Sequence, residues 1–298
     1  MAEEAAGVPD LVIGLLHPGE MGAAVGGCLV EAGYTVWWAS EGRGPDTASR
    51  ARRAGLSDAG RPAALAARSD VIVSVCPPHA AVEVARAVAA GRPAGGRPGA
   101  AGFRGVFVDA NAISPDSSRT VAGIVEAGGA RYVDGAIIGP PPASAGGTRL
   151  YVSGPRAGEI RDLFAGTRMD ARIVDDRIGS ASAVKMAYAA WTKGTAALLL
   201  TVRALATAEG VQDTLLTEWA LSQPELAGRT GRAARSAARK GWRWVAEMEE
   251  IAASMAAAGL PQGFGQAAAE VFGRQPRAAA GDEVSTEAVL GALLSRTR

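Results

Sequence analysis

Short apolar runs of strand length alternate with segments of helical spacing through the first half of the chain. Segments of helical spacing follow the first three runs, at Gly22–Ala32, Thr47–Ala54 and His79–Ala90. The strand-type runs are Leu11–Leu16, Tyr34–Trp38, Val71–Cys76, Val106–Asp109, Tyr132–Ile138, Leu150–Ser153 and Arg172–Val174. This alternation is typical of βαβ units, so we predict an α/β domain with a doubly wound, mostly parallel sheet.

The pattern changes at Gly179, after which it indicates helices alone. The stretch from Ser180 to about Glu209 would form one helix roughly 45 Å long at 1.5 Å per residue. Gly259-Leu260-Pro261 is a helix stop signal. The further predicted helices are Asp213–Leu221, Pro224–Ala237, Trp242–Ala258, Gly265–Phe272 and Ser285–Arg296. At 298 residues two domains are expected, which we place at residues 1–178 and, all-helical, at residues 179–298.

Charge and metal-binding residues exclude several classes of function. The net charge is +1, which predicts neither a nucleic-acid footprint nor binding to an anionic membrane. The two histidines (His17 and His79) and the two cysteines (Cys28 and Cys76) do not cluster. We therefore predict no metal site, and we expect both cysteines to be buried in a reducing compartment.

Targeting signals are not evident at the start of the chain. Met1–Gly7 is acidic and alanine-rich, without the basic and apolar regions of a signal peptide. The long predicted helix carries Lys193 and Arg203 and is too polar to span a membrane. These features predict a cytoplasmic protein.

The segment from Gly14 to Gly22 has the features of a dinucleotide-binding loop. It follows an apolar strand and opens a helix, so backbone N–H groups and the positive end of the helix dipole would face a pyrophosphate. Gly19 permits close approach, whereas His17 replaces the usual first glycine and is a residue type that tolerates unusual dihedral angles. The alternative is a plain strand-loop-helix turn. We predict that NAD or NADP binds a Rossmann-like domain at His17, Pro18, Gly19, Glu20, Met21 and Gly22.

The residues after the second strand favour NADP over NAD. An acidic side chain at this place reads the ribose of NAD, whereas a hydroxyl with an arginine can hold the 2′-phosphate of NADP. Ala39 stands where an acidic residue would bind the ribose of NAD, and Ser40 and Arg43 follow it. Arg50 is a further candidate to hold the 2′-phosphate. Glu41 can accept hydrogen bonds from ribose hydroxyls, so NAD stays an alternative.

Four segments in register resemble the β-hydroxyacid dehydrogenase and 6-phosphogluconate dehydrogenase superfamily. The loop ending in Met21-Gly22 is similar to its G-x-G-x-M-G motif. Cys76-Pro77-Pro78 resembles its proline-containing loop near the cofactor riboses. Asp134–Gly139, continued by Gly146-Gly147-Thr148, resembles its D-A-x-x-x-G…G-T substrate loop. Gly179–Lys185 resembles the G-x-G-x-x-x-K segment that carries the catalytic lysine.

One branch of this superfamily is the most similar. The His17–Gly22 variant and the segment Tyr188–Gly194 resemble the branch with a DUF1932, phosphogluconate dehydrogenase-like, C-terminal domain. We expect the active site in a cleft between the two domains, where ligand sites often lie, and the resemblance implies a homodimer completed by the helical domain. Two positions depart from the family, because Ala189 replaces an asparagine and Asn111 replaces a serine. A standard small β-hydroxyacid substrate is therefore not implied.

Lys185 is the first candidate for catalysis. A lysine beside the nicotinamide can donate a hydrogen bond to the substrate oxygen and shuttle its proton. Its alternative is an exposed or snorkelling lysine. Tyr188 lies nearly one turn later and is a second candidate acid, with core packing as its alternative. Asn111 offers both a donor and an acceptor to substrate or cofactor, and its alternative is an ordinary turn residue.

Other candidates for binding come from both halves of the chain. His79, after Pro77-Pro78, is a cofactor candidate, and it is equally consistent with a helix N-terminus. Lys240 is similar in placement to a family lysine that closes over the cofactor. An amphipathic helix with a basic face is the alternative for the Lys240 segment. The candidates for substrate binding are Gly139, Pro140, Gly147, Thr148 and Trp242. Glu247, Glu249 and Glu250 are expected to form a solvated face.

These features predict an NADP-linked enzyme, with NAD possible, that acts on a small-molecule substrate. The reaction expected is hydride transfer between nicotinamide and a hydroxyl or carbonyl of a small, polar, hydroxyacid-like metabolite, with Lys185 as general acid and base. Imine or iminium reduction is the first alternative: the loss of asparagine at Ala189 favours it, and Lys185 argues against it. A non-catalytic dinucleotide-binding protein is the second alternative.

Overall fold

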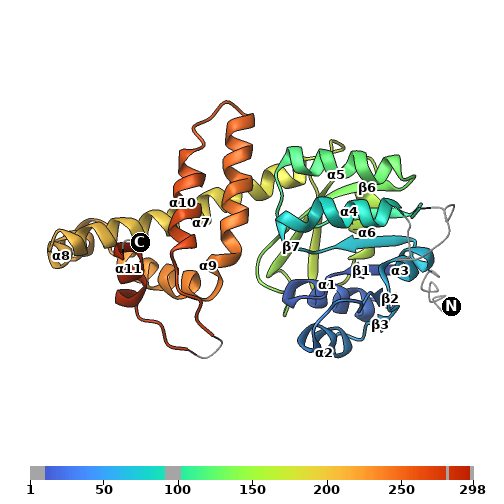
Figure 1. The fold of residues 1–298 in the computed structure, drawn as a ribbon, viewed down its shortest axis with the longest axis horizontal. Coiled ribbons are helices and arrows are strands. Elements are labelled where there is room, and N and C mark those ends of the chain that lie inside the picture. The colour runs from blue at the N-terminus through green and yellow to red at the C-terminus, as the bar shows by residue number, and fades with distance from the viewer. Residues whose placement is uncertain (1–10, 91–101, 280–281, 296–298) are drawn as a thin grey trace, which may run out of the picture. The chain divides into compact units, whose positions relative to one another are not determined.

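The computed structural model describes residues 11–90, 102–279 and 282–295. Met1–Gly7, the segment in which we looked for a signal peptide, lies outside these residues. The chain divides into two compact units, Met1–Lys185 and Met186–Arg298. They are described separately below, and Figure 1 identifies their elements.

An eight-stranded sheet organises the described part of the first unit, in the order β3-β2-β1-β4-β5-β6-β7-β8. All neighbouring strands are parallel except β6 and β7, which are antiparallel. The strands are β1 (Val12–Leu16), β2 (Thr35–Trp38), β3 (Ser57–Asp58), β4 (Val71–Ser74), β5 (Val106–Asp109), β6 (Arg131–Ile138), β7 (Thr148–Ser153) and β8 (Met169–Ile173). The order reverses between β1 and β4, where such sheets bind ligands.

Helices cover both faces of this sheet. They are α1 (Glu20–Glu31), α2 (Pro45–Arg53), α3 (Pro62–Arg68), α4 (Ala81–Ala90), α5 (Pro115–Ala127) and α6 (Ala157–Leu163), with a 3₁₀ turn, η1 (Pro78–Ala80). Leu15 of β1 belongs to one apolar core, with Leu29 of α1 and Ile160 of α6. Leu16 belongs to the other, with Val121 of α5. Figure 1 shows α4 and α5 on the side of the sheet opposite α1 and α2. The predicted doubly wound, mostly parallel α/β fold is confirmed.

The elements that the structure describes after Gly179 are all helices, joined by loops, as predicted. The helices are α7 (Ser180–Ala208), α8 (Gln212–Ser222), α9 (Leu226–Ala257), α10 (Gly263–Gly273) and α11 (Thr286–Leu294). Gly259, with a φ of +71°, follows the end of α9, which confirms the predicted stop. Among the described residues, no helix combines the length and the apolar character that a membrane span requires.

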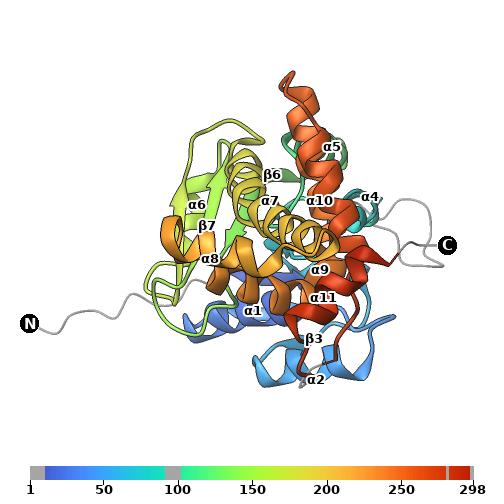
Figure 2. The ribbon, with the colours of Figure 1, turned by 90° about the vertical axis from the view of Figure 1, so that its left-hand side faces the viewer.

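The prediction of two helices at Pro224–Ala237 and Trp242–Ala258 is wrong, because α9 is continuous through residues 238–241. Gly241 is buried in the middle of α9, where a methyl group added to it would have atoms of Phe272 and Gln275 as its nearest neighbours. These atoms lie 3.6 Å from that methyl position, an ordinary van der Waals distance, so the glycine neither ends the helix nor is required for α10 to pack against α9. Figures 1 and 2 show α10 running alongside α9.

Candidate functional site

The predicted cofactor residues of the first unit follow the carboxyl ends of neighbouring parallel strands. Leu16, Ser74, Asp109 and Asp134 stand side by side in the register of β1, β4, β5 and β6. The loops that follow β1, β2, β4 and β5 carry the candidates from His17 to His79 and Asn111. The fold therefore brings these segments, separated in the sequence, to one edge of the sheet.

The loop after β1 is held in a tight turn by its own backbone. His17 has a φ of +67°, a left-handed conformation that is uncommon outside glycine. Its carbonyl accepts a hydrogen bond of 2.7 Å from the Gly19 N–H. A Cβ at Gly22 would lie 2.4 Å from that same oxygen, so position 22 has no room for a side chain. A Cβ at Gly19 would have no neighbour within 4 Å, so this backbone is open to a ligand.

The imidazole of His17 lies in an environment that disfavours its charged form. Burial, followed by the nearby positive charge of Arg43, lowers the pKa of His17 to about 4. The side chain is therefore neutral at physiological pH. Arg43 also acts electrostatically on the Cys76 thiol, so its guanidinium lies near the loops after β1 and β4.

The residues after β2 form a compact turn ahead of α2. The Arg43 N–H donates to the Ser40 carbonyl at 3.0 Å, and Gly42 between them has a φ of +71°. Arg50, one turn into α2, donates from Nη2 to Thr47 Oγ1 at 3.1 Å. The exposed Arg43 and the half-buried Ser40 are thus close along the chain. They lie at the same edge of the sheet as the loop His17–Gly22 after β1, which we call the glycine loop.

Asn111 joins the ends of β4 and β5. Its side chain is 3% exposed, and its Oδ1 accepts a hydrogen bond of 2.5 Å from the Cys76 N–H. Its Nδ2 donates to Ser74 Oγ at 3.4 Å. This amide therefore fixes the start of the Cys76-Pro77-Pro78 loop, which continues into η1 with His79. Burial raises the pKa of the Cys76 thiol to about 12, so this cysteine stays protonated and is not a nucleophile.

The loop between β6 and β7 is closed by its own contacts. The Thr148 hydroxyl is buried and donates to the Pro140 carbonyl at 2.5 Å. Gly139 has a φ of +123°, and a Cβ there would lie 2.4 Å from the Gly147 oxygen. These contacts preshape the segment that contains the four substrate candidates of this loop.

Lys185 lies beside the last part of β6, which extends beyond the end of the neighbouring parallel strand β5. Its ammonium donates to the Ile137 carbonyl at 3.0 Å. Ile137 is three residues past Asp134, the last β6 residue paired with β5. The half-buried Lys185 is therefore held at the same edge of the sheet as the cofactor candidates. Tyr188, further along α7, is 47% exposed, so it is not a core residue of its unit.

The candidates of the second unit lie on α9. Lys240 is exposed there. Trp242 is 44% exposed, and the guanidinium groups of Arg243 and Arg277 lie 4.9 and 5.1 Å from its ring centroid. The ring therefore contacts cations on α9 and on the segment after α10.

The expectation that Glu247 belongs to a solvated face is wrong. Its side chain is buried and forms an ion pair with Lys193 of α7. The Lys193 ammonium also lies 5.4 Å from the centroid of the Trp244 ring. The sequence pattern missed this pair because the two charges are 54 residues apart and meet only in the folded unit.

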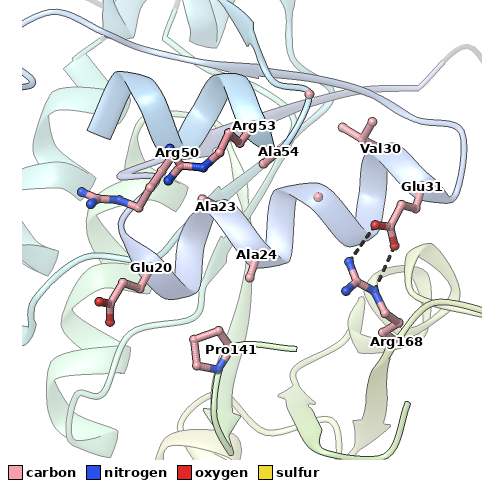
Figure 3. Close-up of a pocket in the computed structure, with 12 residues that line it drawn as sticks. Glu20, Ala23, Ala24, Val30, Glu31, Arg50, Arg53, Ala54, Pro141 and Arg168 are labelled. Carbon is pink, nitrogen blue, oxygen red and sulfur yellow. Dashed lines mark hydrogen bonds and ion pairs between the residues drawn. The ribbon is translucent and has the colours of Figure 1, made fainter. Parts of the chain in front are cut away.

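A groove of about 640 Å³ runs along the outer side of α1 (Figure 3). Arg50 and Arg53 of α2 flank one side of it, and Pro141 and Arg168 flank the other. Arg168 binds both carboxylate oxygens of Glu31, at 3.0 and 2.7 Å. Two predicted site residues line this groove, Glu20 of the loop after β1 and Arg50, the further candidate for the 2′-phosphate. No cluster of three potential metal ligands occurs in residues 11–90, 102–279 and 282–295.

Two family models match the chain. The model of the NAD-binding domain of 6-phosphogluconate dehydrogenase matches residues 12–163, and a domain of unknown function, DUF1932, matches residues 206–275. A curated relative, an uncharacterised 28.5 kDa protein of Methanothermus fervidus, is 27% identical over 152 residues. That match covers 51% of this chain and spans about half, 54%, of the relative.

Solved structures with the same fold cover most of the chain. One is a conserved protein of unknown function reported as structurally similar to 3-hydroxyacid dehydrogenases (25% identity, TM-score 0.64, 88% of this chain and 99% of that one). A second is 3-hydroxyisobutyrate dehydrogenase of Mycobacterium tuberculosis with L-serine (19% identity, TM-score 0.67, 96% of this chain and 99% of that one). A third is a reductive aminase of Aspergillus terreus in complex with an NADPH-type cofactor, cyclohexanone and allyl amine (22% identity, TM-score 0.54, 89% of this chain and 93% of that one).

Proposed function

The chain belongs to the family defined by the NAD-binding domain of 6-phosphogluconate dehydrogenase, and from that premise we propose that it is an NADP-linked oxidoreductase. Its reaction is hydride transfer between nicotinamide and a hydroxyl or carbonyl carbon of a small polar metabolite. The observation that carries this proposal is the Lys185 ammonium, held at 3.0 Å from the Ile137 carbonyl at the edge that bears the glycine loop. The similarity to a protein of unknown function whose structure resembles 3-hydroxyacid dehydrogenases supports the same class of reaction.

The glycine loop fits the phosphates of such a cofactor. Gly19 leaves the backbone open, and the N-terminus of α1 directs its N–H groups and its positive dipole end toward the same place. The neutral imidazole of His17 adds no charge there, so the helix terminus and Arg43 would supply the positive potential. Ser40 and Arg43 would hold the 2′-phosphate, which is the basis for proposing NADP over NAD.

Lys185 carries the proton chemistry in this proposal. A bound nicotinamide would supply a hydride to a carbonyl carbon or accept one from an alcohol carbon. During reduction the Lys185 ammonium donates a hydrogen bond to the carbonyl oxygen and then its proton, leaving a neutral amine. During oxidation the amine takes the hydroxyl proton. Asn111, Tyr188 and the Gly139–Thr148 loop are proposed to orient the substrate.

Lys185→Met should abolish turnover and leave NADPH binding intact, because the variant keeps the volume of the side chain and loses its proton and its charge. Turnover is measured by NADPH absorbance on a panel of hydroxyacids, sugar acids, ketones and cyclic imines, and NADPH affinity by fluorescence titration. Lys185→Arg is the matched control: it keeps the positive charge, but arginine does not release its proton. Activity retained in Lys185→Met would overturn the assignment. If Lys185→Arg retains activity and Lys185→Met does not, Lys185 acts through its positive charge and not through proton transfer.

Arg43→Ala should raise the KM for NADPH by about 10- to 100-fold and change the KM for NADH little. A hydrogen bond to a charged group contributes about 1.5–3 kcal/mol, which corresponds to that range. Steady-state kinetics with both cofactors give the comparison. Arg52→Ala, which removes another exposed arginine nearby on α2, is the control. A wild-type kcat/KM that is higher with NADH than with NADPH would contradict the proposed preference.

Imine or iminium reduction is the second candidate, because the same hydride geometry serves a C=N bond. Ala189 is buried at the position where the family has an asparagine, and this favours a less hydrophilic substrate. The similarity to a reductive aminase structure is consistent with it. Turnover confined to the cyclic imines of the panel would select this candidate. NADPH binding without any turnover would indicate a non-catalytic dinucleotide-binding protein.

Two features of organisation complete the proposal. We propose that residues 1–178 bind the cofactor and that residues 179–298 bind substrate and form a homodimer. Trp191, Leu198 and Leu205 are exposed apolar residues spaced seven apart on α7. Such a stripe suits burial against a partner helix.

A further inference from the structure

The side chain of Asp134 is a buried carboxylate, and hydroxyl and N–H groups of the protein donate hydrogen bonds to it. It is 0% exposed and lies on β6. Its Oδ1 accepts from Ser118 Oγ at 3.0 Å and from Ser182 Oγ at 2.6 Å. Its Oδ2 accepts from Ser153 Oγ at 3.0 Å and from the N–H groups of Gly179 and Ser182 at 3.1 and 2.9 Å. These donors satisfy both oxygens and make the buried charge tolerable.

Three of these bonds come from the start of α7. The first N–H groups of a helix have no partner within the helix and need acceptors elsewhere. Here Asp134 supplies the acceptor for Gly179 and Ser182, and Ser153 Oγ supplies it for Ala181 at 3.0 Å. An anion at this end also interacts favourably with the helix dipole. The first turn of α7 is therefore fixed to β6 and β7.

Lys185 is fixed to the same strand one turn later. It is three residues beyond Ser182 on α7, and its ammonium binds the carbonyl of Ile137, three residues beyond Asp134 on β6. Two successive contacts between one strand and one helix thus determine where the lysine stands. A shift of the helix start would move the ammonium relative to the edge of the sheet.

We propose that Asp134 is a positioning residue for Lys185. It sets the place and the direction of the first turn of α7, and through that turn the distance of the ammonium from the substrate oxygen. This inference rests on the proposed function of Lys185. The carboxylate itself is enclosed and touches neither substrate nor cofactor, so it takes no direct part in proton transfer.

Asp134→Asn tests this directly. An amide has one acceptor oxygen, and its NH₂ group would face the donors now bound to the other oxygen. We expect kcat to fall about 10²-fold, the effect of a displacement near 1 Å at a reacting group. The Kd for NADPH should change by less than about threefold, because the glycine loop is untouched.

A spectroscopic readout separates positioning from a general loss of structure. The chain has three lysines, Lys185, Lys193 and Lys240, so ¹³C-dimethylation gives few side-chain NMR signals. Single lysine-to-arginine variants assign them. In Asp134→Asn the Lys185 signal should move while the other two stay in place. Equal movement of all three signals would overturn the proposal in favour of a structural role.

Two matched serine variants keep the proposal testable if Asp134→Asn does not fold. Ser182→Ala and Ser118→Ala each remove one hydroxyl that donates to Asp134 Oδ1, the first from α7 and the second from α5. At comparable losses of Tm, Ser182→Ala should lower kcat about tenfold and Ser118→Ala less than about twofold; tenfold corresponds to about 1.4 kcal/mol, close to the contribution of one hydrogen bond to a charged group. Equal effects on kcat would contradict positioning through α7.

The two proposals fail differently. If Lys185→Met keeps its turnover, the function proposed for the lysine fails, and the Lys185 signal still tests whether Asp134 positions it. If Lys185→Met is inactive while Asp134→Asn keeps the wild-type kcat and an unmoved Lys185 signal, the positioning role alone is overturned.

Discussion

Replacing Glu247 by alanine is expected to lower the free energy of unfolding by about 3–5 kcal/mol, since it removes one partner of a buried ion pair and takes this counter-charge from the Lys193 ammonium. Glu247 is 6% exposed, and Lys193 keeps little contact with water. The ring of Trp244, 5.4 Å from the ammonium, replaces only part of the lost attraction. Urea unfolding followed by far-UV circular dichroism measures the loss.

Two control variants show whether the effect belongs to the pair. Glu249→Ala removes an exposed carboxylate two residues away on α9 and should change stability by less than about 0.5 kcal/mol. The double variant Lys193→Met with Glu247→Leu removes both charges and should recover most of the stability. A loss below about 1 kcal/mol in Glu247→Ala would show that water screens the pair.

Gly22→Ala is expected to impair both folding and cofactor binding. The new methyl group would lie 2.4 Å from the His17 carbonyl oxygen, so the loop or the start of α1 must move. Overpacking of this kind costs about 1–3 kcal/mol. If the loop yields, NADPH affinity should fall by about 10- to 100-fold. Thermal unfolding and fluorescence titration with NADPH give the two measurements.

Two other glycines separate the loop effect from the general effect of a methyl group. Gly123→Ala lies at an exposed position within α5, has no neighbour within 4 Å, and should be neutral or slightly stabilising. Gly19→Ala also meets no protein atom, so its Tm should be unchanged while NADPH binding weakens. Wild-type affinity in both Gly19→Ala and Gly22→Ala would contradict the assignment of this loop to the cofactor.

Local signals predicted much of the fold. Val106–Asp109 was predicted with the bounds that β5 has, and the change to helices after Gly179 corresponds to the start of α7. Apolar runs of strand length and glycine stops act through nearby residues, so a sequence pattern contains them. The short β3 and the helices α3, α5 and α6 were not predicted. The false break in α9 arose because a local pattern does not contain the packing of α9 against α10, a contact across the fold that supports a continuous helix through Gly241.

Site residues were predictable from the sequence where the local backbone or a family motif requires a particular residue type. The glycine loop follows from the steric demands of its turn, and Lys185 from its resemblance to a family motif. Asp134 was seen only as the first residue of a motif, although it accepts from Ser118, Ser153 and Ser182. Its partners lie 16, 19 and 48 residues away, and no periodicity encodes such distances. The same is true of the pairing of Glu247 with Lys193.

The anchoring of α7 to the sheet also bears on cooperativity. A helix that is capped by its own neighbouring residues can fray at its end while the rest of the protein stays folded. The first turn of α7 instead has its acceptors on Asp134 and Ser153, in the antiparallel pair β6 and β7. We expect the amide hydrogens there to exchange with solvent more slowly than those of a frayed helix end. We therefore expect the position of Lys185 to depend on the integrity of the β6–β7 pair and to be lost when that pair opens.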